Sequence, residues 1–366
     1  MPQLKVIISG GGTGGHIFPA IAIANALKII NKEINILFVG AKGRMEMEKI
    51  PAAGYKIEGL WISGFQRKLT LSNLSFPLKL ISSLLKARKI IKEFKPNVVV
   101  GVGGYASGPL LQVAVNRKIP TLIQEQNSYP GITNKILAKK VNKICVAYDG
   151  MSRFFPKEKV ILTGNPVRQD IINLEGKRER GLEFFEISKD KKTLLVIGGS
   201  LGAKTINESI IACLEDFSQN GFQVIWQTGI SFFKNAQMAV EKYSSQIKVY
   251  DFISRMDYAY AVADMVISRA GAISVSELCL VKKPAILIPS PNVAEDHQTK
   301  NAMALFNHKA AVILKDAEAK EKLKSVTIDL MNDEMQRNKL QENIARLAFK
   351  DSASVIANEI LRLIKN

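Results

Sequence analysis

Short apolar runs rich in β-branched residues alternate along the whole chain with longer amphipathic segments. Such runs are typical of strands buried on both faces of a parallel sheet, and the segments between them are typical of covering helices. In the first half the pattern predicts strands at Lys5–Ser9, Ile34–Val39, Val98–Gly101, Thr121–Gln124, Lys143–Val146 and Val160–Leu162. In the second half it predicts strands at Thr193–Ile197, Gln223–Gln227, Lys248–Tyr250, Met265–Ser268, Ala285–Pro289 and Ala311–Ile313. The sequence therefore predicts an α/β fold with two doubly wound parallel sheets.

Turn-forming residues separate the two sets of strands. A glycine, an asparagine and a proline follow a predicted strand within residues 163–166, which indicates a domain boundary there. We expect one Rossmann-like domain over residues 1–164 and a second over residues 165–340. Residues 341–366 form a C-terminal segment with a predicted helix at Ser352–Ile364, whose apolar face needs a partner and is a candidate to return to the first domain.

Charge is distributed unevenly between these domains. The formal net charge is +18, and residues 1–164 carry 24 basic and 8 acidic side chains, which gives +16. The stretch from Gly59 to Lys92 has seven basic residues, among them Arg67 and Lys68, and no acidic one. Trp61 and Phe65 lie in the same stretch. Cations mixed with aromatic groups favour a face that contacts an anionic membrane, the alternative being a solvated basic helix. Because a nucleic-acid binder would not need this uneven distribution, no nucleic acid is expected as a partner.

The rest of the composition is that of an ordinary soluble protein. No apolar run reaches 18 residues, the N-terminal residues lack the pattern of a signal peptide, and three isolated cysteines show no metal or redox spacing. We expect buried thiols and a reducing cytoplasm.

Three segments share one construction, in which a strand leads through glycines into a helix: Gly10–His16, Val98–Pro109 and Leu194–Asn207. Glycine lets the backbone approach a ligand, and a helix N-terminus favours an anion, so each turn is a candidate anion cradle. Gly10, Gly12 and Gly15 formally match the dinucleotide fingerprint. However, no carboxylate follows the second strand to hold a ribose, and no P-loop occurs, so a nicotinamide enzyme is not expected.

The second half contains a different nucleotide pattern. The segment from Ser268 to Glu277 follows a predicted strand and opens a helix, which places Glu277 to accept hydrogen bonds from both hydroxyls of a ribose. A polar loop over residues 289–301 then offers Asp296, His297 and Gln298, the mixture of donors and acceptors that sugar hydroxyls need. Helix capping explains some of these residues, but not their clustering after strand ends.

Seven motifs lie in order between Gly10 and Ala302: GGGTGGHIFPA, GVGGYASGP, QEQN, GNPVR, GGSLGA, SRAGAISVSE and EDHQTKNA. Together they resemble the bacterial peptidoglycan N-acetylglucosaminyltransferases, which make lipid II from lipid I. The resemblance implies a GT-B fold, in which two Rossmann-like domains face across a cleft. It also implies an inverting transfer of N-acetylglucosamine from UDP-N-acetylglucosamine to the 4-hydroxyl group of the N-acetylmuramoyl unit of lipid I.

The donor contacts that the resemblance implies are Thr13, Gly14, Gly15, Asn127, Arg168, Ser200, Gly202, Ile253, Ala272, Ile273, Ser274, Glu277 and Gln298. Arg168, Ser200 and the backbone near Gly202 would stabilise the charge that develops on the leaving UDP. No Asp-x-Asp motif is present, so no essential bound metal and no cofactor are expected.

The acceptor hydroxyl needs a base, and His16 at a helix N-terminus is the favoured candidate because its ordinary pKa lies near 6.5. Glu125 and Tyr105 are the alternatives, and His16 could instead orient substrate or cap the turn. Gly103, Gly104 and Tyr105 are expected at the acceptor. Because lipid I is an anionic lipid of the inner leaflet, Trp61, Phe65, Arg67 and Lys68 are expected to meet anionic lipids at the cytoplasmic face of the bacterial inner membrane, as part of a peripheral enzyme.

Two other enzymes would share such a fold. A glycolipid glycosyltransferase with a diacylglycerol acceptor would use the same basic face, and a UDP-N-acetylglucosamine 2-epimerase would use carboxylates without a lipid acceptor. A binding module without activity would not need both the anion loops and His16.

Overall fold

The computed structural model describes residues 3–64, 75–199 and 201–365, which form two compact units. The first unit comprises Met1–Arg168 with Asp351–Asn366, and the second comprises Gln169–Lys350. Both boundaries lie later in the chain than the sequence pattern indicates. The segment after the last strand of the first unit stays there because the buried Asn165 side chain donates to the Gln126 carbonyl and accepts from Gln124 Nε2. Residues 341–350 stay with the second unit because Leu340 and Ile344 are buried in it.

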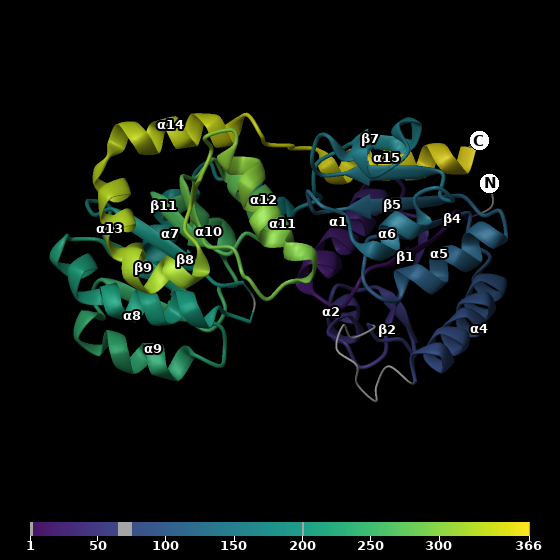
Figure 1. Cartoon of the computed structure of the whole chain (residues 1–366), viewed down its shortest axis with the longest axis horizontal. Coiled ribbons are helices and arrows are strands. Elements are labelled where there is room, and N and C mark those ends of the chain that lie inside the picture. Colours follow the sequence, from purple (N-terminus) through teal and green to yellow (C-terminus); the bar gives the residue numbers. More distant parts are fainter. Residues whose placement is uncertain (1–2, 65–74, 200, 366) are drawn as a thin grey trace. The chain divides into compact units, whose positions relative to one another are not determined.

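The first unit is built on a parallel sheet whose described strands follow the order β3-β2-β1-β4-β5-β6-β7 (Figure 1). The strands are β1 (Lys5–Ser9), β2 (Asn35–Ala41), β3 (Lys56–Leu60), β4 (Val98–Gly101), β5 (Thr121–Glu125), β6 (Lys143–Val146) and β7 (Val160–Leu162). The sequence pattern does not predict β3. This strand lies at the sheet edge, and its exposed Lys56 and Glu58 interrupt the apolar run by which the other strands are found.

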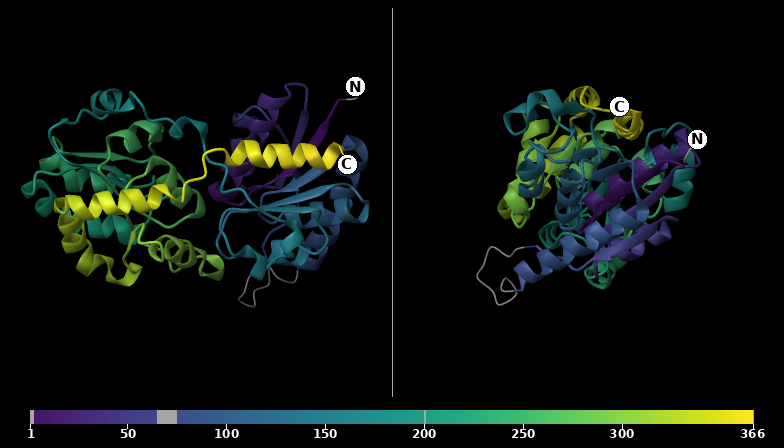
Figure 2. Two further views of the ribbon diagram at one scale, coloured as in Figure 1. Left: turned by 90° about the horizontal axis from the view of Figure 1, so that it is seen from above. Right: turned by 90° about the vertical axis from the view of Figure 1, so that its right-hand side faces the viewer.

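The helices of the first unit are α1 (Gly14–Ile30), α2 (Glu46–Ala52), α4 (Phe76–Phe94), α5 (Ser107–Asn116), α6 (Ile132–Leu137) and α15 (Ser352–Lys365), with short 3-10 turns at η1 (Met151–Arg153) and η2 (Lys157–Lys159). The C-terminal α15 packs on α1, as Figure 2 shows. Its apolar face, which includes Ile356 and Ile360, lies in one core with Ile23 and Leu27 of α1. The C-terminal helix therefore returns to the first unit.

The second unit repeats the arrangement with a parallel sheet whose described strands follow the order β10-β9-β8-β11-β12-β13. The strands are β8 (Thr193–Ile197), β9 (Gln223–Gln227), β10 (Ile247–Tyr250), β11 (Met265–Ser268), β12 (Ala285–Leu287) and β13 (Val312–Ile313). The helices are α7 (Lys177–Phe185), α8 (Lys204–Gln219), α9 (Phe233–Val240), α10 (Met256–Val262), α11 (Ala272–Val281), α12 (His297–Phe306), α13 (Ala319–Asn332) and α14 (Glu334–Ala345), with 3-10 turns at η3 (Gln169–Ile171), η4 (Glu241–Tyr243), η5 (Ala294–Asp296) and η6 (Asp316–Glu318).

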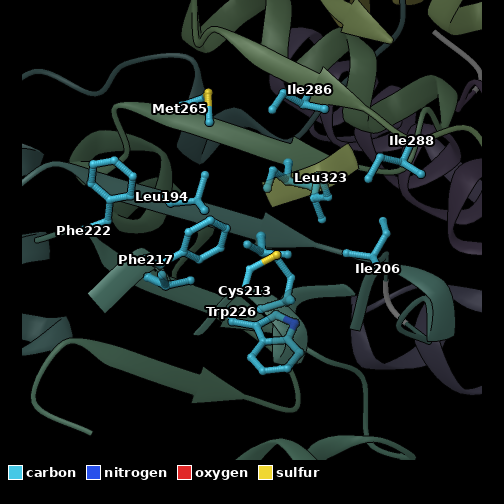
Figure 3. Close-up of a cluster of buried hydrophobic side chains, with 14 of the residues drawn as sticks. Leu194, Ile206, Cys213, Phe217, Phe222, Trp226, Met265, Ile286, Ile288 and Leu323 are labelled. Atoms are coloured by element: carbon cyan, nitrogen blue, oxygen red, sulfur yellow. The ribbon is translucent and has the colours of Figure 1, made fainter. Parts of the chain in front are cut away.

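A large apolar core fills one side of this second sheet. Figure 3 shows Trp226 of β9, Phe217 of α8 and Leu194 of β8 within it, and all three side chains are fully buried. Because every paired strand runs parallel, all strands of a sheet end at the same edge. Loops that follow neighbouring strands therefore lie side by side, which is how this type of fold assembles a site. No helix among the described residues is long and apolar enough to cross a bilayer.

Candidate active site

Three neighbouring strands of the first unit bring predicted site residues to one edge of the sheet. In spatial order these strands are β1, β4 and β5. His16 follows β1, Gly103–Tyr105 follow β4, and Glu125 and Asn127 stand at the end of β5. The strand order thus gathers residues that are more than a hundred positions apart in the sequence.

His16 lies in the first turn of α1 with its imidazole half-buried. Its Nδ1 is 2.9 Å from the Gly11 carbonyl oxygen, with Thr13 Oγ1 at 3.5 Å. Because a carbonyl oxygen only accepts, Nδ1 carries the hydrogen, and the neutral ring presents the lone pair of Nε2. Burial lowers the pKa of His16, while the Gly11 hydrogen bond and the charges of Glu125 and Glu46 act to raise it. The ring is therefore held in the tautomer that accepts a proton at Nε2.

The loop after β4 closes against this ring. A Cβ atom on Gly103 would lie 2.7 Å from His16 Nε2, and one on Gly104 would overlap the Gly11 backbone. Both glycines have positive φ angles, +104° and +87°. Ser107 Oγ secures the loop, at 2.8 Å from the Gly103 carbonyl oxygen and 3.1 Å from that of Ser9. Glycine is thus required here by close approach to the histidine loop.

Glu125 is buried, and both of its carboxylate oxygens already accept hydrogen bonds. Oε1 accepts from the backbone N–H and the side-chain amide of Asn127, at 3.0 and 3.2 Å. Oε2 accepts from Gly131 N–H at 3.1 Å and from Asn134 Nδ2 at 2.8 Å. These contacts shape the loop between β5 and α6 and hold Asn127 in place. To take a proton, Glu125 would have to break some of them.

Of the remaining acceptor and membrane candidates, Tyr105 and Trp61 lie on the surface of the first unit. Tyr105 is 49% exposed, and its ring covers Gly64, where a Cβ would overlap it. Trp61 is 51% exposed. Phe65, Arg67 and Lys68 lie outside the described residues, as does Ser200 of the second unit.

Glu46 belongs to this edge, although sequence reasoning missed it. The residue opens α2 after β2, and its carboxylate is buried against the glycine loop. Oε2 accepts from Gly12 N–H at 2.8 Å, and a Cβ on Gly11 would overlap the carboxylate. The N–H of Gly12 is therefore taken by the chain's own carboxylate and does not face a ligand. The first helical turn, at Thr13, Gly14 and Gly15, retains the character of an anion cradle, because N–H groups there lack partners within the helix.

The GNPVR segment ends the first unit beside β5. The Asn165 contacts with Gln124 and Gln126 anchor it, and Gly164 takes a positive φ of +74° in the turn. Arg168 is half-buried at the end of this segment. The donor residues that the resemblance implies thus fall in both units, with Arg168 the last of those in the first.

In the second unit, Gln227 at the end of β9 connects two predicted donor segments. Its Nε2 donates to the Gly199 carbonyl at 3.0 Å, and its Oε1 accepts from Ile253 N–H at 2.9 Å. Gly202 packs so closely on the Thr228 carbonyl that a Cβ atom would overlap it, and its φ is +78°. Because the Ile253 N–H is engaged, a contact from Ile253 to a ligand would use its carbonyl group.

Glu277 lies in the second turn of α11 and is 6% exposed. Its Oε2 accepts a hydrogen bond of 3.0 Å from the hydroxyl of Tyr260, a buried residue of α10. Ala272, Ile273 and Ser274 form the first turn of the same helix and are half-buried, after the N-cap residue Gly271. The turn and the carboxylate therefore stand on one helix, as the sequence predicts.

Gln298 lies in the first turn of α12, after the next strand along the sheet. Its Oε1 accepts from Ser290 N–H at 2.8 Å and so fixes the polar loop. Asn301, one turn later, donates to the Ala270 carbonyl at 3.3 Å and connects α12 with the turn before α11. Asp296 adopts a left-handed backbone conformation with φ +52°. Among the described residues, no group of three His, Cys, Asp or Glu side chains is arranged to hold a metal ion.

Two sheets of Rossmann order, each with its polar residues at the carboxyl edge, are the arrangement of a two-domain enzyme that acts on a nucleotide sugar. The chain belongs to glycosyltransferase family 28. The model of the family's N-terminal domain matches residues 6–146, and that of its C-terminal domain matches residues 193–356.

Full-length relatives carry one enzyme name. The chain is 58% identical to a protein of Phocaeicola vulgatus over 99% of this chain and 96% of the relative, and 54% identical to one of Parabacteroides distasonis over 100% and 99%. Both are named UDP-N-acetylglucosamine–N-acetylmuramyl-(pentapeptide) pyrophosphoryl-undecaprenol N-acetylglucosamine transferase. The crystal structure of Acinetobacter baumannii MurG matches with a TM-score of 0.78 at 26% identity, covering 98% of this chain and 99% of that one.

Proposed function

We propose that the chain transfers N-acetylglucosamine from UDP-N-acetylglucosamine to the 4-hydroxyl group of the N-acetylmuramoyl unit of lipid I, which forms lipid II in peptidoglycan synthesis. Relatives with this enzyme name over nearly the full length support the proposal. The observation in the structure that carries it is the His16 ring, whose Nδ1 is bound to the Gly11 carbonyl so that Nε2 is the accepting nitrogen.

The reaction uses His16 as the general base. The acceptor hydroxyl gives its proton to Nε2 while its oxygen bonds to the anomeric carbon of the sugar. The bond from that carbon to the β-phosphate oxygen breaks, and UDP leaves with the electron pair. Attack from the opposite face inverts the anomeric configuration. His16 is favoured over Glu125, because the Glu125 oxygens already accept from Asn127, Gly131 and Asn134.

The donor contacts form two groups. In the second unit, Glu277 receives the ribose hydroxyls, Gln298 the sugar, and the turns at Gly202 and Ala272–Ser274 the diphosphate and base. In the first unit the contacts are Thr13, Gly14, Gly15, Asn127 and Arg168, and Ser200 and Ile253 of the second unit complete the set. Arg168 is suited to the diphosphate because a guanidinium pairs with phosphate oxygens at two points.

The test is the incubation of the protein with labelled UDP-N-acetylglucosamine and lipid I, followed by detection of UDP and of the disaccharide product. The proposal expects product with lipid I and none with diacylglycerol. His16→Ala should lower kcat by about 100-fold or more, the contribution typical of a general base. His308→Ala is the matched control, because His308 is an exposed histidine of the second unit. Absence of product with lipid I would refute the function, and near-normal turnover of His16→Ala would refute the base.

We further propose that the first unit binds the cytoplasmic surface of the inner membrane through α4. Leu78, Ile81 and Leu85 are 64%, 56% and 60% exposed at helical spacing, so they form one stripe. The exposed Arg88, Lys89 and Lys92 continue this stripe toward the helix C-terminus. Apolar groups that enter the interface beside cations that meet anionic headgroups are what a peripheral membrane helix needs.

Vesicle sedimentation tests the membrane proposal. We expect binding to vesicles that contain phosphatidylglycerol, weaker binding in high salt, and little binding to pure phosphatidylcholine. Leu85→Ser should weaken binding, whereas Ile29→Ser should not, although Ile29 is 76% exposed on another helix of the same unit. Equal binding to both vesicle types, independent of salt, would refute the electrostatic contribution.

A further inference from the structure

Glu46 is a buried carboxylate that the proposed reaction does not use. It is 1% exposed, although it stands in the first turn of a short helix where a glutamate would ordinarily face solvent. Each oxygen accepts one backbone N–H: Oε2 from Gly12 at 2.8 Å and Oε1 from Ala41 at 3.0 Å. The carboxylate therefore connects the end of β2 with the loop after β1.

The peptide group between Gly11 and Gly12 is shared by Glu46 and His16. Its N–H, which belongs to Gly12, donates to Glu46 Oε2, and its C=O, which belongs to Gly11, accepts from His16 Nδ1. Hydrogen bonds at both ends of one peptide group polarise each other, so a negative charge at the N–H makes the carbonyl a stronger acceptor. One planar peptide thus couples the carboxylate to the imidazole.

Two glycines leave the space that the Glu46 side chain occupies. A Cβ atom on Gly40 would lie 2.6 Å from Glu46 Cγ, and one on Gly11 would overlap the carboxylate. Gly40 lies in β2 and Gly11 in the loop after β1, so at both points glycine is required by the space that the carboxylate occupies.

We propose that Glu46 is a positioning residue for His16, which holds the ring in its Nδ1–H tautomer and increases its basicity through the Gly11–Gly12 peptide group. The inference rests on the proposed function, in which His16 is the base. A carboxylate bonded directly to Nδ1 performs this task in serine hydrolases. Here one peptide group stands between the carboxylate and the ring.

Two carboxylates raise the pKa of the His16 ring. They are Glu46 on α2 and Glu125 at the end of β5, and the negative charge of each raises the pKa of the ring against the lowering effect of burial. Glu125 keeps its four hydrogen bonds when only Glu46 is changed, so its contribution stays constant. A change in the titration of His16 in a Glu46 variant can then be assigned to Glu46.

Glu46→Gln is the decisive variant, and Glu48→Gln is its matched control, because Glu48 is an exposed glutamate on the same helix. A glutamine has one accepting oxygen, so it cannot satisfy both N–H groups and carries no charge. We expect kcat of Glu46→Gln to fall about 10-fold to 100-fold, by comparison with the loss of a partner that orients a metal-binding histidine. The KM for UDP-N-acetylglucosamine should change less than about threefold, because the interaction acts on the chemical step.

The pH profile separates positioning from simple support of the loop. His16 must be neutral to accept a proton, so kcat falls on the acid side as the ring becomes protonated. Removal of the Glu46 charge lowers the pKa of His16, and the acid limb should move to lower pH in Glu46→Gln but not in Glu48→Gln. An unshifted limb with normal kcat would overturn the inference.

Nitrogen NMR of the histidine rings tests Glu46 without reference to activity. The chain has three histidines, and His16→Gln assigns the His16 signals. The wild-type protein should show Nδ1–H with unprotonated Nε2, whereas Glu46→Gln should show mixed tautomers and a lower pKa. Loss of turnover in His16→Gln supports the proposed function, and if turnover persists the ring signals alone decide the role of Glu46. If Glu46→Gln does not fold, Glu46→Asp replaces it, since the shorter side chain cannot reach both N–H groups; unchanged ring signals there would overturn the inference.

Discussion

Substitution of Gly103 by alanine should displace the ring of His16, the proposed base. The new Cβ would lie 2.5 Å from His16 Cδ2, whereas non-bonded carbon atoms settle at about 3.5–4.0 Å. The ring or the loop must therefore move by roughly 1 Å. A misplacement of this size costs about 100-fold in rate. We expect kcat to fall by about two orders of magnitude, measured as transfer of labelled N-acetylglucosamine to lipid I.

Gly54→Ala is the control for backbone strain. Gly54 has φ +84°, and a Cβ there would meet nothing within 4 Å. Each substitution should lower the free energy of unfolding by about 1–2 kcal/mol, because non-glycine residues disfavour positive φ. Only Gly103→Ala should lose turnover. If Gly103→Ala keeps more than about a third of the kcat of Gly54→Ala, turnover does not require the observed position of the His16 ring. This result would refute the reasoning that a displacement of the ring slows the reaction.

Three further experiments probe the second unit. Tyr260→Phe removes the hydrogen bond that orients the Glu277 carboxylate, and such a bond is worth about 1.5–3 kcal/mol for a charged acceptor. The KM for UDP-N-acetylglucosamine should therefore rise about 10-fold or more. An unchanged KM would refute a ribose contact that depends on the orientation of Glu277 by Tyr260. The Arg255 guanidinium holds the pKa of the Asp257 carboxyl far below its usual range. The ionised carboxylate therefore stabilises the folded protein fully above about pH 4, and this contribution is lost as the pH falls further. Asp257→Asn should make the free energy of unfolding, measured by urea titration, depend less on pH in this acid range. Burial raises the pKa of Cys279 to about 12, so iodoacetamide at pH 8 should label the unfolded chain rapidly and the native chain slowly; equal rates would contradict its burial.

The fold follows from the sequence to the extent that strands are buried on both faces. The strands at Val98–Gly101 and Thr193–Ile197 are largely apolar runs that lead into glycine turns, and both occur where the pattern predicts them. The edge strand Lys56–Leu60 is missed, because the face of this strand that carries Lys56 and Glu58 is exposed and so does not require apolar residues. The return of α15 to the first unit depends on its packing against α1. The helical spacing of its apolar residues predicts that one face of α15 is buried, but not against which helix.

The same limit applies to the candidate site. Glycine turns identify His16, Gly103 and Glu277 because the chemistry and the turn are adjacent in the sequence. Glu46 has no such local signal. Its role depends on the pairing of β2 with β1, which brings Ala41 N–H and Gly12 N–H to one carboxylate. A contact between neighbouring strands can be predicted only after the strand order is known.

The two units brace their first glycine loops with chemically different groups, and this difference favours different tasks. In the first unit the brace is the carboxylate of Glu46. Its negative charge disfavours a diphosphate beside Gly12. The same charge favours the protonated imidazole that a base such as His16 becomes when it accepts a proton. In the second unit the brace is the neutral amide of Gln227, which bonds the Gly199 carbonyl and brings no charge. An anionic ligand at that loop therefore meets no opposing carboxylate from its brace. One type of loop can thus support a base in one unit and a nucleotide diphosphate in the other, because the charge of a single buried side chain differs.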